Sequence, residues 1–350
     1  VTKGTLNNAV IALPPQAEQH RIVAKVDELM ALCDSLEQQQ EDSIQAHETL
    51  VEALLDTLTN VADADAFQIA WQRISAHFDA LFTTVHSVQE LKETIRQLSI
   101  QGKLVPQNAN NELANELLKR IAFEKDLLIK DKRIKGKNLL LEISDEEKSF
   151  DLPKGWEWCR IREIMSSERD ISYGVIKLEQ EPTYDGIPTL RCSDVKSGFI
   201  DLSGIRTVSP DVEKPYKRTR LIGGEVLVNI RGTLGGVALV HKELAGFNIA
   251  REVAMLPVHT EIEGSYLVNV ILSPFFWEKI ESNLKGIAYK GLNLNILRDL
   301  VIPIPPLAEQ HRIVAKVDEL MALCDQLKES LEQAQQTQIH LTDAVVENAL

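Results

Sequence analysis

Apolar residues recur at helical spacing in two stretches of the chain whose sequences are nearly the same. Residues 17–34 and 308–325 match at all 18 positions, with an offset of 291 residues, and each copy follows a pair of prolines. A proline pair fixes φ and stops the preceding extended segment, whereas the residues after it are strong helix formers with an acidic residue near the start. Each copy is therefore predicted to begin a helix.

The apolar positions of both copies alternate between four and three residues apart, which keeps them on one side of a helix. This spacing is typical of a coiled-coil seam. The pattern falters at Gln40, Ser43 and His47 of the first helix, which suggests a change of partner there. The predicted seam residues are Ile22, Val26, Leu29, Cys33 and Leu36 in the first copy, and Ile313, Val317, Leu320, Cys324, Leu327 and Leu331 in the second. A duplicated helical hairpin with only a packing role is the alternative.

The helical pattern continues well beyond the first copy. Residues from 16 to about 60 read as one helix, which at about 1.5 Å per residue spans on the order of 60 Å. Residues 63–103 read as a second helix that bends or breaks before 101–106, and residues 110–128 as a shorter one. The basic run 130–137 is interpreted as a solvated linker, with a direct phosphate contact as the alternative.

Between residues 150 and 305 the pattern changes to short alternating or apolar runs separated by Gly and Pro. A helix is predicted over 265–284, with a kink near Pro274. The predicted strands are 187–191, 225–230, 237–240 and 252–258. The predicted fold class is α+β: one domain with a twisted, mixed and mostly antiparallel sheet, plus two long helical regions that form an antiparallel coiled coil.

The composition is that of a folded protein, and its charge is unevenly distributed. Of 350 residues, 44% are hydrophobic and 26% charged, without an apolar run long enough to span a membrane or a signal-peptide core, so the chain is predicted to be cytoplasmic. Residues 150–305 carry 19 Lys and Arg against 20 Asp and Glu; the remainder carries 19 against 32, which is −13 of the net charge of −14. The acidic excess thus belongs to the helices, and the middle domain can present a basic face.

Motifs for catalysis are weak throughout the chain. The glycine-rich turn 231–236, RGTLGG, lacks the ending of a phosphate-binding P-loop, and neither a nucleophile elbow nor a zinc helix occurs. We therefore predict no catalytic residue and no metal. Two alternatives stay open: a zinc site from Cys159, Cys192, His241 and His259, which no C-x-x-C spacing supports, and a nuclease site around Asp185, Asp194 and Glu225.

Residues suited to nucleic acid are more numerous, and they fall in predicted turns of the middle domain. Arg and Lys bind phosphates, and Arg, Lys and Asn can also pair with guanine or adenine edges in the major groove. The predicted DNA-binding residues are Tyr173, Gly174, Lys177, Arg191, Lys214, Lys217, Arg218, Arg220, Asn229, Arg231, Thr233, Lys290, Asn293 and Asn295. We expect Arg191→Ala or Arg231→Ala to weaken binding with little loss of folding. A coiled-coil adaptor that binds only protein is the alternative.

Several short sequence motifs, taken in their order along the chain, resemble those of the DNA specificity subunits of type I restriction-modification systems, often called HsdS. The two proline-initiated repeats look like the starts of that family's conserved helical regions. FDALFTT at 78–84 and IQGKLVPQ at 100–107 are similar to its central region, and LPKGWEW at 152–158 looks like the beginning of its second target-recognition domain. By this resemblance the domains are 1–13, the remnant of a first recognition domain; 14–105, the first conserved helical region; 106–150, a helical linker; 151–305, the second recognition domain; and 306–350, the second conserved helical region.

The resemblance also implies a function without catalysis by this chain. A family member reads a bipartite site on double-stranded DNA, uses its helices as a spacer, and scaffolds methyltransferase subunits and a restriction and translocase subunit. S-adenosylmethionine, Mg²⁺ and ATP are then expected on those partners, and no cofactor on this chain. Because most of the first recognition domain is missing from residues 1–350, the chain is interpreted as a fragment with one reader, which can self-associate through exposed seams.

Overall fold

The computed structural model describes residues 12–133, 142–284 and 291–349, and it divides the chain into two compact units. The first unit, Val1–Leu54, contains most of helix α2 (Gln16–Thr59). The second unit, Leu55–Leu350, contains all the strands of the described chain. The single long helix predicted from residue 16 to about 60 is confirmed.

The second predicted helix, over 63–103, is wrong, because the segment forms three helices: α3 (Ala64–Ser75), α4 (Phe78–Leu81) and α5 (Val85–Ile100). Thr84 is extended, and its hydroxyl accepts a hydrogen bond from Ser87 N (3.1 Å), so a capping box starts a new helix there. Aromatic rings stack across the corner in the order Phe67, Trp71, Phe78 and Phe82, with centroids 5.9, 6.0 and 4.9 Å apart. The aromatic run thus folds back on itself instead of lining one helix.

The strands of the second unit form three sheets. The four-stranded antiparallel sheet has the order β2-β8-β5-β6, and the three-stranded sheet β4-β3-β7 is mixed, because β3 pairs parallel with β7. Their bounds are β2 Ser172–Tyr173, β3 Ile187–Leu190, β4 Arg206–Val208, β5 Val226–Asn229, β6 Val237–Leu239, β7 Asn248–Ile249 and β8 Val253–Leu256. All four predicted strands are confirmed, as is the α+β fold class.

A further strand pair closes the domain and was not predicted. β1 (Glu157–Arg160) pairs antiparallel with β9 (Val301–Ile304), so the chain enters and leaves the domain side by side. The predicted kink near Pro274 is confirmed as a break between α8 (Gly264–Leu272) and α9 (Pro274–Leu284). Short helical segments also went unpredicted, among them α7 (Pro210–Glu213), η3 (Lys214–Thr219) and α10 (Leu294–Asp299).

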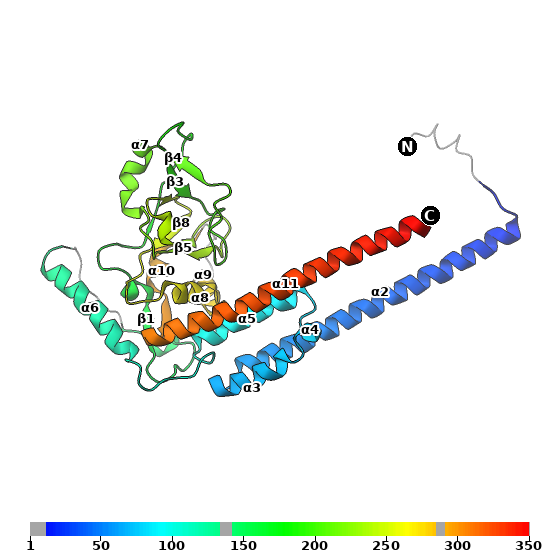
Figure 1. Ribbon diagram of the computed structural model, residues 1–350, viewed down its shortest axis with the longest axis horizontal. Coiled ribbons are helices and arrows are strands. Elements are labelled where there is room, and N and C mark those ends of the chain that lie inside the picture. Colours follow the sequence, from blue (N-terminus) through cyan, green and yellow to red (C-terminus); the bar gives the residue numbers. More distant parts are fainter. Residues whose placement is uncertain (1–11, 134–141, 285–290, 350) are drawn as a thin grey trace. The chain divides into compact units, whose positions relative to one another are not determined.

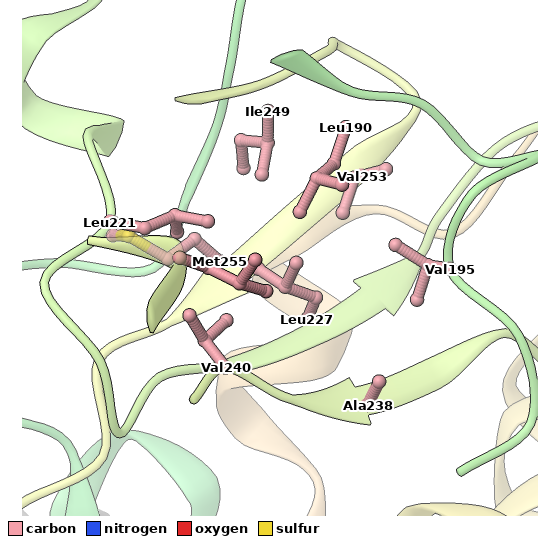
Figure 2. Close-up of a cluster of buried hydrophobic side chains, with 10 residues drawn as sticks. Leu190, Val195, Leu221, Leu227, Ala238, Val240, Ile249, Val253 and Met255 are labelled. Atoms are coloured by element: carbon pink, nitrogen blue, oxygen red, sulfur yellow. The ribbon is translucent and has the colours of Figure 1, made fainter. Parts of the chain in front are cut away.

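The core of the α/β part lies between the two larger sheets. Figure 2 shows Leu227 and Met255, from neighbouring strands of the four-stranded sheet, close to Leu190 and Ile249 of the three-stranded sheet. All four side chains are fully buried. Burying apolar surface at roughly 25 cal/mol per Å² fixes the two sheets against each other, and therefore fixes the loops at their ends.

The helices form a second layer on this domain. α8 contacts β5 and β6, and it also contacts α5 and α11 (Leu307–Ala349), which run alongside each other (Figure 1). The shorter α6 (Ala114–Lys130) is held to the domain by Arg120, whose Nε lies 2.9 Å from Glu261 Oε2. The α/β domain thus contacts the α5–α11 pair through α8.

The predicted seam of the second copy is buried over its first four positions. Ile313, Val317, Leu320 and Cys324 are 0 to 1% exposed, and α11 packs there against α5 and α8. An ion pair between Lys92 of α5 and Asp325 marks the end of this contact. The seam of the first copy lies on α2, where all five predicted side chains are exposed. Pairing of α2 with α11 as a coiled coil stays a prediction.

A buried carboxylate joins the start of α11 to the rest of the domain. Glu309 Oε1 accepts hydrogen bonds from Trp156 Nε1 (3.0 Å) and Gln107 Nε2 (2.7 Å). Glu309 is 1% exposed, and this burial raises the pKa of its carboxyl although both hydrogen bonds lower it. The neighbouring Gln310 donates to Pro305 O (2.9 Å) and accepts from Glu263 N (2.9 Å).

We expect Glu309→Gln to remove part of the pH dependence of stability. A carboxyl whose folded pKa is raised binds more protons in the folded than in the unfolded state, so its contribution to the free energy of unfolding falls as pH rises from about 4.5 through the folded pKa. Glutamine keeps an oxygen for both donors but does not titrate. Urea unfolding should therefore show the variant gaining stability relative to wild type between pH 4 and pH 7. An equal difference at both pH values would contradict this assignment.

Candidate nucleic-acid interface

Three loops meet at one end of the four-stranded sheet, and backbone hydrogen bonds hold them together. Ile230 N, at the end of β5, donates to Glu252 O (2.8 Å), and Leu292 N donates to Ile230 O (2.7 Å). Arg251 N donates to Val175 O (2.9 Å), which ties the segment after β2 to the start of β8. Predicted binding residues that lie far apart in the sequence are therefore brought to one end of the domain.

Most of the predicted residues on these loops are exposed. Arg231 is exposed, and no ion pair engages its side chain within the described residues. Gly291 has a φ of +136°, and a Cβ there would lie 2.8 Å from Arg231 Cγ, so the glycine makes room for the arginine stem. The exposed members of this set, which we call the loop surface, are Tyr173, Lys177, Arg231, Thr233, Asn293 and Asn295.

Two asparagines of the loop surface also begin helix α10. Asn293 Oδ1 accepts a hydrogen bond from Asn295 N (2.9 Å), which caps the helix, and Asn295 Oδ1 accepts from Arg298 Nη1 (3.0 Å). Because both Oδ1 atoms already accept hydrogen bonds, the side-chain NH₂ groups are the ones that remain to bind a ligand. Gly174 is buried, and a Cβ at this position would lie 1.8 Å from Ile249 O. Gly174 therefore serves the close approach of two chain segments.

Of the basic residues predicted around Tyr216, three lie on helix η3 and Arg220 directly follows it. Lys214, Lys217 and Arg218 are exposed, and no ion pair engages them among the described residues; we call these three the basic cluster. Arg220 differs, because its Nε donates to Glu213 Oε1 (3.0 Å), and Glu213 is fully buried. The charge of Arg220 is thus compensated within the domain.

A buried polar network fixes the basic cluster in place. Glu213 accepts a hydrogen bond from Asn248 Nδ2 (3.0 Å), and Thr219 Oγ1 donates to Asn248 Oδ1 (2.8 Å). Asn248 belongs to β7, so both ends of η3 are attached to the three-stranded sheet. The second carboxylate oxygen of Glu213 makes no hydrogen bond but lies 2.9 Å from Arg220 Nη2. Such a network rigidifies the segment that carries it, and here that segment presents three cations to solvent.

The basic cluster borders a hollow of about 630 Å³ that reaches β2. Lys217, Arg218 and Arg220 line it together with Ser172, Ile222, Glu168 and Asp170. The two acidic residues have basic partners, since Glu168 pairs with Arg133 (3.0 Å) and Asp170 pairs with Arg298 (3.0 Å). The hollow therefore offers uncompensated positive charge beside an exposed apolar side chain.

The side chains of two predicted binding residues bind other groups within the domain. Asn229 is 1% exposed, and its Nδ2 donates to Cys192 O (2.9 Å) and Val195 O (3.1 Å), so it ties two loops together. Arg191 forms a bidentate pair with Asp194, through Nε (3.1 Å) and Nη2 (3.0 Å), and the pair raises the pKa of the guanidinium. Both geometries favour a structural role. Lys290 falls outside the described residues.

For Arg191→Ala the structure changes the expected result from weaker DNA binding to lower stability. Asp194 is only 4% exposed, and the substitution leaves its carboxylate without its cation, which costs about 1–3 kcal/mol. Arg206→Ala is the control, because its pair with Glu181 (3.4 Å) is exposed and should contribute less than about 1 kcal/mol. Urea unfolding measures both. If the Arg191→Ala protein is as stable as wild type but binds DNA more weakly, the structural assignment is wrong and Arg191 is a DNA-binding residue.

Two of the three acidic residues of the nuclease alternative, Asp194 and Glu225, are also engaged locally. Asp194 is paired with Arg191, and buried Glu225 is paired with Arg169 and accepts hydrogen bonds from Ile222 N (2.9 Å) and Gly223 N (2.8 Å). Within the described residues no group of three or more His, Cys, Asp or Glu could hold a metal ion.

None of the described helices has the length and apolar character needed to cross a bilayer.

Exposed apolar side chains of the same domain were not predicted from the sequence. Tyr184 is 82% exposed, Phe199 60% and Ile222 65%. Large apolar side chains on polar loops are common contacts for bases and sugars. Their position within turn sequences such as PTYDG and SGF was the available signal, but exposure itself could not be read from the sequence.

Comparisons with known proteins agree on one family. Residues 153–335 match the model described as the type I restriction modification DNA specificity domain. The chain is 37% identical over 356 residues to the type I restriction enzyme EcoEI specificity subunit of Escherichia coli, covering 100% of this chain and 60% of the relative. It is 36% identical to the EcoAI specificity subunit of the same species, covering 98% and 58%. The chain thus spans about three fifths of the length of these relatives.

Solved structures give matches of lower similarity. The HsdS subunit from Thermoanaerobacter tengcongensis has a TM-score of 0.39 and 20% identity, covering 76% of this chain and 56% of that one. A chain from a study of assembly and conformational transition in a type I R-M system has a TM-score of 0.44 and 20% identity, covering 79% and 58%.

Proposed function

Because the chain belongs to the type I restriction-modification DNA specificity family, we propose that its middle domain reads one half of a bipartite site on double-stranded DNA. The reader comprises residues 151–305. The chain itself carries out no catalysis in this proposal. It selects the sequence at which partner subunits act.

The observation that carries the proposal is the rigidly mounted, uncompensated basic cluster. Lys214, Lys217 and Arg218 project from a helix held at both ends by the Glu213 and Asn248 network. Phosphate contacts supply sequence-independent affinity and set the register of a protein on the duplex. Three cations on a fixed segment are suited to that task, because the backbone that carries them does not have to be ordered on binding.

The loop surface is proposed to read base edges. Arginine can pair with the O6 and N7 atoms of guanine, and asparagine with N6 and N7 of adenine. Arg231, Asn293 and Asn295 carry these groups on loops held together by backbone hydrogen bonds. Tyr173, Lys177 and Thr233 are proposed to flank them. The division into a phosphate-binding cluster and a base-reading surface predicts different effects of mutations in the two.

We expect Arg231→Ala to lower affinity for the target duplex and leave affinity for unrelated DNA nearly unchanged. Loss of a bidentate base contact costs about 1–3 kcal/mol, or roughly 5- to 150-fold in Kd. Fluorescence anisotropy at fixed salt, with a selected target and a scrambled duplex, separates the two affinities. Arg206→Ala, an arginine of the same domain paired with Glu181, is the control. An equal loss on both duplexes would make Arg231 a phosphate contact.

The helices are proposed to act as spacer and scaffold. α2 has 44 residues and α11 has 43, so each spans about 65 Å at about 1.5 Å per residue. A rod of fixed length sets the separation between two DNA-reading surfaces, which is itself a parameter of the target site. Their acidic surfaces are proposed to hold methyltransferase and restriction subunits, which would carry S-adenosylmethionine, Mg²⁺ and ATP. Parts of α11 beyond Cys324, including half-buried Leu327 and Leu331, are available for pairing between rods.

A further inference from the structure

The two identical 18-residue copies adopt the same local structure but differ in what covers them. In both, the glutamine of the first turn donates to the carbonyl of the first proline, Gln19 to Pro14 (2.7 Å) and Gln310 to Pro305 (2.9 Å). The ion pairs Lys25–Glu28 and Lys316–Glu319 are also the same, at 2.8 Å. Sequence and helix geometry therefore do not distinguish the copies.

Exposure does distinguish them. Leu320 is fully buried, whereas Leu29 is 48% exposed; Val317 is 1% exposed, whereas Val26 is 50%. Cys324 is buried and Cys33 is exposed. The first copy therefore presents, as an open face, the same side chains that the second copy buries.

Helices α5 and α8 both pack against the second copy, and α5 makes the more extensive contact. α5 supplies the fully buried Leu91, Ile95 and Leu98, and its Lys92 forms the ion pair with Asp325. The loop that follows α5 turns at Gly102 and delivers Gln107, which donates to Glu309 (2.7 Å). The matching groups of the first copy, Asp34 and Glu18, are exposed.

From this comparison we propose that the face of α2 formed by Ile22, Val26, Leu29 and Cys33 is a docking site for a second helix of the α5 kind. The occupant carries apolar residues at the spacing of Leu91, Ile95 and Leu98, and a lysine next to the first of them that pairs with Asp34. A glycine turn and an amide donor for Glu18 follow the helix. DNA binding by the middle domain is not needed for this interaction.

A second copy of this chain does not supply the docking helix, because the chain has fewer α5 helices than helix starts for them to cover. Residues 1–350 contain two helix starts of this sequence but the α5 sequence only once, and its apolar face is already buried. Any number of copies would leave half of the helix starts uncovered. The helix must therefore come from a segment that residues 1–350 do not supply.

A synthetic peptide with the sequence of residues 84–107 is the direct probe. A side-chain staple between positions 89 and 93, which are exposed in α5, keeps it helical without touching the contact face. Full-length chain is alkylated with iodoacetamide with and without saturating peptide, and the modified cysteines are identified by mass spectrometry. Cys33 should react in the chain alone, Cys324 should not, and the peptide should protect Cys33.

Matched variants show whether the peptide uses the proposed face. Leu29→Glu should weaken binding of a labelled peptide on the order of a hundred-fold or more, because a carboxylate would be buried in the contact. Leu32→Glu should change it less than about two-fold, because its counterpart Leu323 stays 44% exposed in the covered copy. Asp34→Lys should weaken binding about two- to five-fold, and a peptide with Lys92→Glu should restore it.

Three results would overturn the proposal. Cys33 unreactive in the chain alone would mean that the face is already covered. Cys33 fully reactive at saturating stapled peptide would mean that an α5-type helix does not bind there. Equal effects of Leu29→Glu and Leu32→Glu would place the peptide elsewhere.

Discussion

Leu320→Glu should destabilise the protein by more than about 4 kcal/mol, whereas Leu29→Glu, in an identical sequence, should change the free energy of unfolding by less than about 0.5 kcal/mol. Both substitutions change helix propensity by the same amount, since the neighbours in sequence are the same. They differ only in surroundings: Leu320 is fully buried where α11 packs on α5 and α8, and Leu29 is 48% exposed. Urea unfolding followed by circular dichroism measures both values.

The same two helices contain their own controls. Leu323 and Leu32 occupy equivalent positions in the two copies and are 44% and 56% exposed. Glutamate at either position should therefore have a small and similar effect. Equal losses from Leu29→Glu and Leu320→Glu would mean that the two copies are covered alike, and the distinction drawn between them would fail.

Replacing the basic cluster should have the largest effect on DNA binding. The triple variant Lys214→Ala, Lys217→Ala, Arg218→Ala removes the three proposed phosphate contacts, each of which would contribute about 0.9 to the slope of log affinity against log salt. The slope should fall by roughly 3, and affinity near 0.15 M salt on the order of a hundred-fold, on target and unrelated duplexes alike. Stability should change little, because the three side chains are exposed and have no ion-pair partner within the described residues.

A control with the same loss of charge is needed for the triple variant. Lys25, Lys119 and Lys154 are exposed and lie outside the basic cluster. Their joint replacement by alanine lowers the net charge equally but should leave the salt slope nearly unchanged. If the two triple variants behave alike, the effect is one of overall charge, and the cluster has no special role.

Local patterns in the sequence predicted much of the fold. The long helix α2, the four strands and the break at Pro274 follow from the spacing of apolar residues and from proline chemistry, which act over a few residues. The pairing of β1 with β9 was not predictable in this way, because its partners are separated by more than a hundred residues. The division of residues 63–103 into three helices depended on how an aromatic run packs.

Which residues of the candidate interface are free to bind DNA was also not predictable from local sequence. Arg191 ends a predicted strand and Arg231 follows one, and both were predicted to bind DNA. Only the structure shows that Arg191 is paired with Asp194, three residues later, while Arg231 has no ion pair within the described residues. The two identical helix starts show this directly, since Leu320 is fully buried whereas the matching Leu29 is 48% exposed. Burial is set by tertiary partners, which a local pattern does not encode.

Selection of bound oligonucleotides from a random duplex library tests the central claim most directly. The full chain, together with its proposed methyltransferase partner, should enrich a short defined motif, and Arg231→Ala should relax that motif at a limited number of positions. The basic-cluster variant should recover the same motif with lower yield. Absence of any enriched motif with the wild-type chain, under conditions in which it binds DNA, would contradict the proposal that residues 151–305 read sequence.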